Sequence, residues 1–210
     1  MQVKILIADD HSVVRQGLRH IVETRPGWTV VAEVSTADEV LPVLRSVGAD
    51  VVVLDVALGD RSGIDVLGHI RAEFPNVPVL MLSMHAEEQY AIRCLRAGAS
   101  GYIQKERSAE EILTAIERVA SRRIYVSEGV SDQMAAELLR GGPSQPHELL
   151  STREFEVFRL IAEGKSPTVI AEALHLSVKT VSTYRSRILL KTGFKSNADI
   201  VSYAIRNHLV

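Results

Sequence analysis

The chain has one cysteine, Cys94, among its 210 residues, so it cannot form an internal disulfide. Small secreted domains often rely on disulfides, and the lack of a pair favours a reducing compartment. The sequence also lacks an apolar run near the roughly 18 residues that span a bilayer. No basic segment followed by an apolar stretch opens the chain, as a secretory signal would. We therefore expect a cytoplasmic protein that does not associate with membranes.

A strong net charge is missing as well, because the formal total is only −2. That balance conceals two unlike parts. Residues 1–146 contain 15 Lys and Arg against 20 Asp and Glu, a net of −5, whereas residues 147–210 contain 9 against 6, a net of +3. A length of 210 residues allows one or two domains. The split therefore predicts an acidic first part and a basic second part with different functions.

A short apolar run that ends in a carboxylate is the most informative stretch of the first part. Val51–Leu54 are four consecutive apolar residues followed directly by Asp55. An unbroken β-branched run of this length is typical of a strand covered on both faces of a parallel sheet. Val3–Ala8 ends in the same way, at Asp9 and Asp10. Because ligands bind at the carboxyl ends of such strands, we expect the three carboxylates to share one site if the strands are neighbours.

Carboxylates gathered in one cleft repel one another and raise one another's pKa unless a cation neutralises them. Oxygen ligands alone select a hard cation, and a few carboxylates completed by water suit Mg²⁺ better than Ca²⁺. The alternative is that Asp9 and Asp55 only cap the loops that follow them. Three carboxylates at two strand ends favour the metal site.

Apolar strand patterns alternate with helical patterns through the whole first part. The predicted strands are residues 3–8, 28–34, 50–54, 77–82 and 101–103, and the predicted helices are residues 12–23, 36–47, 63–74, 86–97 and 108–119. Five such repeats predict a parallel sheet with helices on both faces and right-handed crossovers. Pro42 lies inside the second helix, and we expect it to kink or shorten that helix.

Polar residues follow four of these strands, and they form a recognisable set: Asp9, Asp10, Asp55, Ser83 and Lys105. This set, at these strand ends, resembles the receiver domain of two-component response regulators. The resemblance covers residues 1–122 and implies a flavodoxin-like (βα)5 fold. It also implies that Asp55 accepts a phosphoryl group from a sensor histidine kinase. Such a protein is not an enzyme, apart from catalysing its own phosphorylation and dephosphorylation.

The same resemblance implies roles for the residues around Asp55. Mg²⁺ would be held by Asp9, Asp10, Asp55 and the backbone carbonyl of Ala57. Lys105 would pair with a phosphoryl oxygen, as a compact cation can. Ser83 would donate a hydrogen bond to another phosphoryl oxygen and vacate space for Tyr102, which makes these three residues the expected switch. The alternative for Tyr102 is a half-buried residue on an edge strand.

The second part contains four helix starts after a linker. Residues 123–147 are predicted to be the linker, with a short helix at residues 131–140, and residues 148–210 are predicted to be a second domain. Helix caps are expected at Ser151, Ser166, Ser177 and Ser196. Two short helices joined by a tight turn and followed by a longer helix predict a helix-turn-helix in an all-α, four-helix domain.

This run resembles the LuxR-type DNA-binding domain, and both domains together resemble the NarL/FixJ class of response regulators. In the third helix, Val181, Tyr184 and Ile188 are expected to face inward. The opposite side is rich in hydroxyl and basic groups, which suit base edges and phosphates of double-stranded DNA, whereas a merely solvated face would usually mix charges of both signs. The candidate DNA contacts are Lys179, Thr180, Ser182, Thr183, Arg185, Ser186, Arg187 and Lys191.

The last helix carries more apolar positions than one side of a small domain needs. Ile200, Val201, Ala204 and Ile205 are the candidate contacts of a homodimer, which would bind two half-sites in a promoter operator. The sequence thus predicts a phosphorylation-controlled transcription regulator. One alternative is a DNA-binding regulator that is independent of phosphorylation and uses the receiver only for dimerisation. Another is a flavodoxin-like phosphohydrolase, which the short loops after the strands disfavour.

Overall fold

The computed structural model describes residues 2–59, 61–84, 87–140 and 145–210. The chain divides into two compact units, residues 1–131 and residues 132–210, which we call the N-terminal unit and the C-terminal unit. Residues 141–144 of the predicted linker lie outside the described residues. Of the helices in the described ranges, none combines the length and the apolar character that crossing a bilayer requires.

The N-terminal unit is built on a five-stranded sheet whose neighbouring strands are all parallel. Its strands are β1 (Val3–Ala8), β2 (Trp28–Val34), β3 (Val51–Asp55), β6 (Val79–Ser83) and β7 (Gly101–Gln104). Their order across the sheet is β2-β1-β3-β6-β7, so the order reverses between β1 and β3. The expected neighbourhood of the two strands that end in carboxylates is confirmed, and it lies at the position where open α/β sheets bind ligands.

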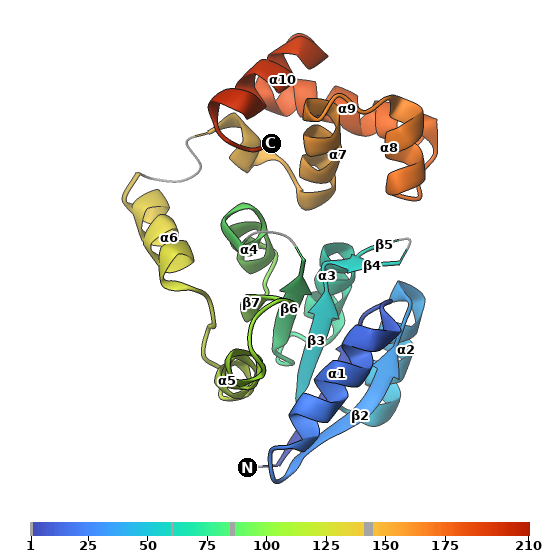
Figure 1. Cartoon of the computed structure of the whole chain (residues 1–210), viewed down its shortest axis with the longest axis vertical. Coiled ribbons are helices and arrows are strands. Elements are labelled where there is room, and N and C mark those ends of the chain that lie inside the picture. Colours follow the sequence, from blue (N-terminus) through green and yellow to red (C-terminus); the bar gives the residue numbers. More distant parts are fainter. Residues whose placement is uncertain (1, 60, 85–86, 141–144) are drawn as a thin grey trace. The chain divides into compact units, whose positions relative to one another are not determined.

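Five helices cover the two faces of this sheet (Figure 1). They are α1 (Ser12–Glu23), α2 (Ala37–Val47), α3 (Gly63–Glu73), α4 (Glu87–Arg96) and α5 (Ala109–Ala120). Leu18 of α1 and Ile116 of α5 join the valines and isoleucines of the strands in one buried core. The alternation of strands and helices, and therefore the doubly covered parallel sheet, is confirmed.

Pro42 does not shorten α2, contrary to our expectation, because the helix continues for five residues beyond it. A proline inside a helix lacks the N–H group that would bond the carbonyl four residues earlier, here that of Asp38. Both Pro42 and Asp38 are exposed, so water can bond that carbonyl. A capping box at Thr36 and Glu39 and a left-handed Gly48 fix the two ends of the helix.

A small antiparallel ribbon after β3 was not predicted. It pairs β4 (Ala57–Leu58) with β5 (Arg61–Ser62). Strands of two residues are too short to show alternation in the sequence. The dipeptide Gly59–Asp60 between them was the available signal, since Gly-Asp is a common hairpin turn, although Asp60 itself lies outside the described residues.

The described part of the C-terminal unit is helical, and its last four helices have the predicted caps. The helix α6 (Glu128–Arg140) begins in the N-terminal unit and ends in the C-terminal unit. The 3-10 helix η1 (Pro146–Leu149) follows, and then α7 (Thr152–Ala162), α8 (Pro167–Ala173), α9 (Val178–Thr192) and α10 (Asn197–Arg206). Each of the four predicted cap serines accepts a hydrogen bond from the backbone N–H three residues later. The four-helix arrangement is confirmed, while α6 begins three residues before the predicted helix and η1 was not predicted.

Candidate functional site

The parallel pairing of β1 with β3 brings the predicted carboxylates together. Asp55 is the last residue of β3, and Asp9 directly follows β1. Asp9 is 0% exposed and Asp55 is 2% exposed, whereas Asp10 is exposed. Two buried carboxylates side by side require a compensating cation.

Lys105 supplies that positive charge in the present structure. Its Nζ lies 2.8 Å from Asp9 Oδ2 and 2.7 Å from Asp55 Oδ2, and its side chain is only 4% exposed. The backbone N–H of Lys105 donates to the carbonyl of Ser83 at 2.8 Å, which holds the residue beside the end of β6. The ammonium group therefore bridges the two buried carboxylates.

These contacts shift the pKa of both partners. Burial raises the pKa of Asp55 from 3.8 to about 6, although the hydrogen bond from Lys105 and its positive charge oppose the rise. Burial alone would lower the pKa of Lys105, but its hydrogen bonds to Asp55 and Asp9 outweigh this and raise it. At neutral pH the site therefore holds an ionised Asp55 that is only weakly stabilised, as a carboxylate nucleophile requires.

The site has the donor chemistry that a hard divalent cation requires. Asp9, Asp10, His11 and Asp55 each offer one ligand atom, and these atoms lie within 4.8 Å of one another. Three of the four are carboxylate oxygens, which fit Mg²⁺. The backbone N–H of Ala57 donates to Asp55 Oδ1 at 3.2 Å, so this loop is tied to the same carboxylate.

Two further residues shape the site, and the sequence analysis did not predict them. His11 Nδ1 lies 2.6 Å from Asp10 Oδ1, although we expected no histidine in the cluster; its position next to Asp10 was the signal. Gly63 begins α3 against the end of β3, where an added Cβ would meet the carbonyl oxygen of Asp55 at 1.8 Å. Only glycine allows this approach, and the sequence gives no sign of it because the contact is not local.

Ser83 lies on β6, which pairs with β3, and Tyr102 lies on β7, the edge strand that pairs with β6. Ser83 ends β6 and is 1% exposed, while Tyr102 lies in β7 opposite Met81 and is fully buried. The alternative that Tyr102 is half-buried is therefore wrong. Because both side chains are buried, a movement of either requires the neighbouring side chains to rearrange.

In the C-terminal unit, α9 has the predicted inward and outward sides. Val181 and Ile188 are buried and Tyr184 is partly buried. The outward residues of the predicted set are Lys179, Ser182, Thr183, Ser186 and Arg187, all exposed. Thr180 bonds the hydroxyl of Ser177 at the start of the helix.

Two basic residues of α9 contact other helices of the C-terminal unit. Arg185 Nε donates to Asn197 Oδ1 at 2.6 Å, which ties α9 to the start of α10. Lys191 Nζ donates to Glu154 Oε2 at 2.7 Å, and Glu154 is 3% exposed. That carboxylate also accepts the backbone N–H and the hydroxyl of Ser151, both at 2.8 Å. Lys191 therefore stabilises the start of α7, independently of any contribution to DNA binding.

Lys191→Ala is expected to destabilise the C-terminal unit by about 1 to 3 kcal/mol, because it removes a charged partner from a buried carboxylate. Calorimetric unfolding measures this as a lower midpoint for that unit. Lys179→Ala is the matched control on the same helix: Lys179 is exposed, and its removal should change the stability by less than about 0.5 kcal/mol. Equal midpoints for the two variants would show that the contact with Glu154 contributes nothing.

The apolar residues of α10 divide between the interior and the surface. Ile200 and Ala204 are fully buried in the C-terminal unit, where α10 packs against α7. Val201 is partly exposed and Ile205 is 60% exposed. Of the four predicted dimer contacts, only Val201 and Ile205 therefore reach the surface of this unit.

Comparisons with known proteins match the two parts of the chain to two protein families. The family described as "Response regulator receiver domain" matches residues 5–117, and the family "Bacterial regulatory proteins, luxR family" matches residues 148–204. The response regulator UvrY of Escherichia coli (strain K12) is 31% identical over 99% of this chain and 95% of its own. The oxygen regulatory protein NreC of Staphylococcus aureus (strain bovine RF122 / ET3-1) is 34% identical over 99% of both chains.

Solved structures show the same similarity. A LuxR-family two-component response regulator from Aurantimonas sp. SI85-9A1 matches with a TM-score of 0.61 and 34% identity, over 66% of this chain and 99% of the other. RcsB from Salmonella enterica serovar Typhimurium, bound to promoter rprA in the presence of a phosphomimetic, matches with a TM-score of 0.67 and 25% identity, over 97% and 98%. The chain therefore belongs to the NarL/FixJ response regulators, transcription factors that join a receiver domain to a LuxR-type DNA-binding domain.

Proposed function

We propose that Asp55 accepts a phosphoryl group from a sensor histidine kinase and that this controls DNA binding. The observation that carries the proposal is the bridge from Lys105 to the two buried carboxylates of Asp9 and Asp55. Mg²⁺ would be held by Asp9, Asp10, Asp55 and the backbone carbonyl of Ala57. When bound, it would neutralise charge on the carboxylate and on the incoming phosphoryl group.

The chain's own residues supply the rest of the transfer. An Asp55 carboxylate oxygen forms the new bond to phosphorus while the bond to the kinase's histidine nitrogen breaks. Lys105 then exchanges one carboxylate contact for a phosphoryl oxygen, since it is already poised 2.7 Å from Asp55. Ser83 donates its hydroxyl hydrogen to another phosphoryl oxygen, and Tyr102 follows into the space that Ser83 leaves.

The output is DNA binding through α9. Lys179 and Arg187 are the exposed basic residues of the set without a protein partner in the described part of the chain, and we assign them to phosphate contacts. The hydroxyl groups of Ser182, Thr183 and Ser186 face the major groove. Thr180, in the first turn of α9, lies where the helix enters the groove. Arg185 and Lys191 position the helix through their contacts with Asn197 and Glu154. Val201 and Ile205 of α10 contact the second subunit of a dimer.

Treatment with acetyl phosphate and Mg²⁺ tests the whole proposal. The mass should increase by one phosphoryl group, the fraction of dimer should rise, and the affinity for operator DNA should increase with it. An operator fragment is selected beforehand from random DNA. Labelled protein whose DNA affinity stays the same would favour a regulator independent of phosphorylation, and continuous hydrolysis of the acetyl phosphate would favour a phosphohydrolase.

A further inference from the structure

The opposite edge of the receiver sheet contains a cavity that the proposed function does not use. It has a volume of about 340 Å³ and lies where the strands begin, between Asp50 before β3, Pro78 before β6 and Arg122 after α5. A second cavity of about 200 Å³ adjoins it and shares Asn76, Pro78 and Arg122. The first lies within the size range of pockets for small ligands.

Among the residues that the structure describes, the second cavity is lined by three arginines, Arg71, Arg122 and Arg123, and by no acidic residue. The Arg71 guanidinium donates to the backbone carbonyls of Pro75 and Val77, so hydrogen bonds hold it in place without a carboxylate. Burial lowers the pKa of Arg71. Neither Arg122 nor Arg123 has a side-chain partner within the described residues. Arginines gathered without a counter-charge favour an anion.

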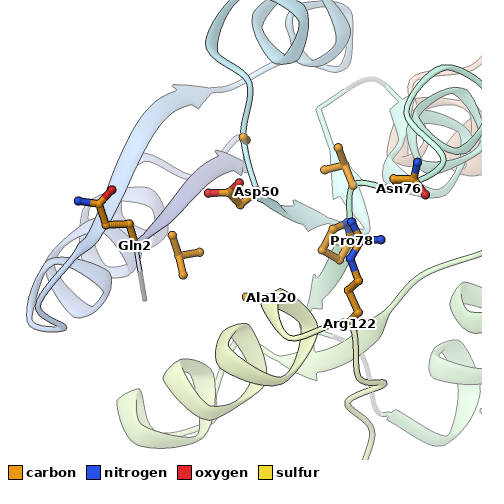
Figure 2. A pocket seen from close by; sticks show the side chains of 9 residues that line it. Gln2, Asp50, Asn76, Pro78, Ala120 and Arg122 are labelled. Carbon is orange, nitrogen blue, oxygen red and sulfur yellow. The ribbon is translucent and has the colours of Figure 1, made fainter.

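The first cavity adds a carboxylate at its far side. Asp50 and Arg122 lie on opposite sides of it, with Pro78 next to Arg122 (Figure 2). One Asp50 oxygen accepts the backbone N–H of Lys4 at 2.8 Å, which fixes the side chain and leaves the other oxygen available. We propose that the two cavities form a binding site for a small anion, a carboxylate or a phosphate, that also carries an amine. The anionic group contacts Arg122 and Arg123, and the amine contacts Asp50.

The backbone of Arg122 makes a sharp test possible. Arg122 has a φ of 59°, in the left-handed region, at the end of α5. Its N–H donates to Val119 and the N–H of Arg123 donates to Arg118, a helix ending that usually has glycine at this position. Arg122→Gly therefore removes the guanidinium and relieves backbone strain together. The variant should fold at least as well as the parent chain.

An NMR titration of the full chain tests the proposal. The probes are succinate, aspartate, ethyl phosphate and O-phosphoethanolamine, which compare carboxylate with phosphate and each anion with and without an amine. The backbone amides of Asp50, Asn76 and Arg122 should shift in a saturable way. The amine-bearing probe of the preferred anion should bind roughly tenfold more tightly than its partner, in line with one added charge-assisted contact. Asp50→Asn should remove that difference.

Arg122→Gly should weaken binding roughly tenfold or more while its unfolding midpoint stays equal or rises. Arg118→Ala, on the same helix, exposed and outside both cavities, is the matched control and should bind as the parent does. The proposal is overturned if no probe gives saturable shifts at these amides, or if Arg122→Gly binds as tightly as the parent chain. Phosphate that binds at the Asp55 site instead is detected separately, because it shifts the backbone amides beside Asp55.

Discussion

Asp55→Asn is expected to abolish phosphorylation by acetyl phosphate and by a sensor kinase. An amide cannot act as the oxygen nucleophile that forms an acyl phosphate. Asp55 is the carboxylate of the site at the end of β3, so no other one takes its position. Intact-mass spectrometry and the alkali lability of the adduct measure the result. Asp10→Asn should keep the adduct but require more Mg²⁺ to form it. An Asp55→Asn protein labelled at the parent rate would show that another residue is the acceptor.

Unfolding of the Asp55→Asn protein cannot explain the expected loss of phosphorylation, because the substitution should stabilise the receiver. The pKa of Asp55 is raised from 3.8 to about 6, so the folded state holds this proton more tightly than the unfolded state. The contribution of Asp55 to the stability of the receiver therefore falls as the pH rises from about 4 to 6, and above pH 6 the ionised Asp55 continues to destabilise the fold. The shift already includes the opposing contact with Lys105, and it corresponds to about 3 kcal/mol at most. The unfolding midpoint at pH 8 should rise, and the gain should shrink towards pH 4.

Local signals explain why so much of the fold could be predicted. Ser166, Ser177 and Ser196 mark helix starts through hydrogen bonds to residues three positions away, so the information lies within one turn. The run Val51–Leu54 is buried on both faces and shows it in composition alone. Asp9 and Asp55 could be placed together because parallel strands share one edge for their carboxyl ends.

The parts that could not be predicted depend on contacts between distant segments. The partner of Lys191 is Glu154, 37 residues earlier, and helical periodicity assigns Lys191 only to an outer side. Ile200 and Ala204 are spaced like Val201 and Ile205, yet the packing of α7 buries the first pair and leaves Ile205 exposed. Periodicity identifies an apolar stripe but not its width, which the neighbouring helix determines.

Lys179→Glu and Thr183→Ala are expected to impair DNA binding in different ways. Reversing the charge of Lys179 removes a phosphate contact and adds repulsion, so affinity should fall by roughly a hundredfold for all sequences alike, and the salt dependence should decrease by about one unit of slope. Lys4→Glu makes the same change of net charge at an exposed position of the receiver and should have little effect. Competitive binding at two salt concentrations measures both quantities.

Thr183→Ala should instead change the preferred base at one position of the half-site. The hydroxyl of Thr183 donates to the carbonyl of Lys179 at 3.0 Å, so its lone pairs point outward and accept hydrogen bonds. Acceptors in the major groove select the amino groups of adenine or cytosine, and losing one good contact lowers discrimination by about 1 to 3 kcal/mol. Selection from a randomised half-site library should show a weakened preference for adenine or cytosine. If Thr183→Ala leaves the selected sequence unchanged while Lys179→Glu alters it, α9 is rotated about its axis relative to the proposed orientation, and Lys179 reads bases.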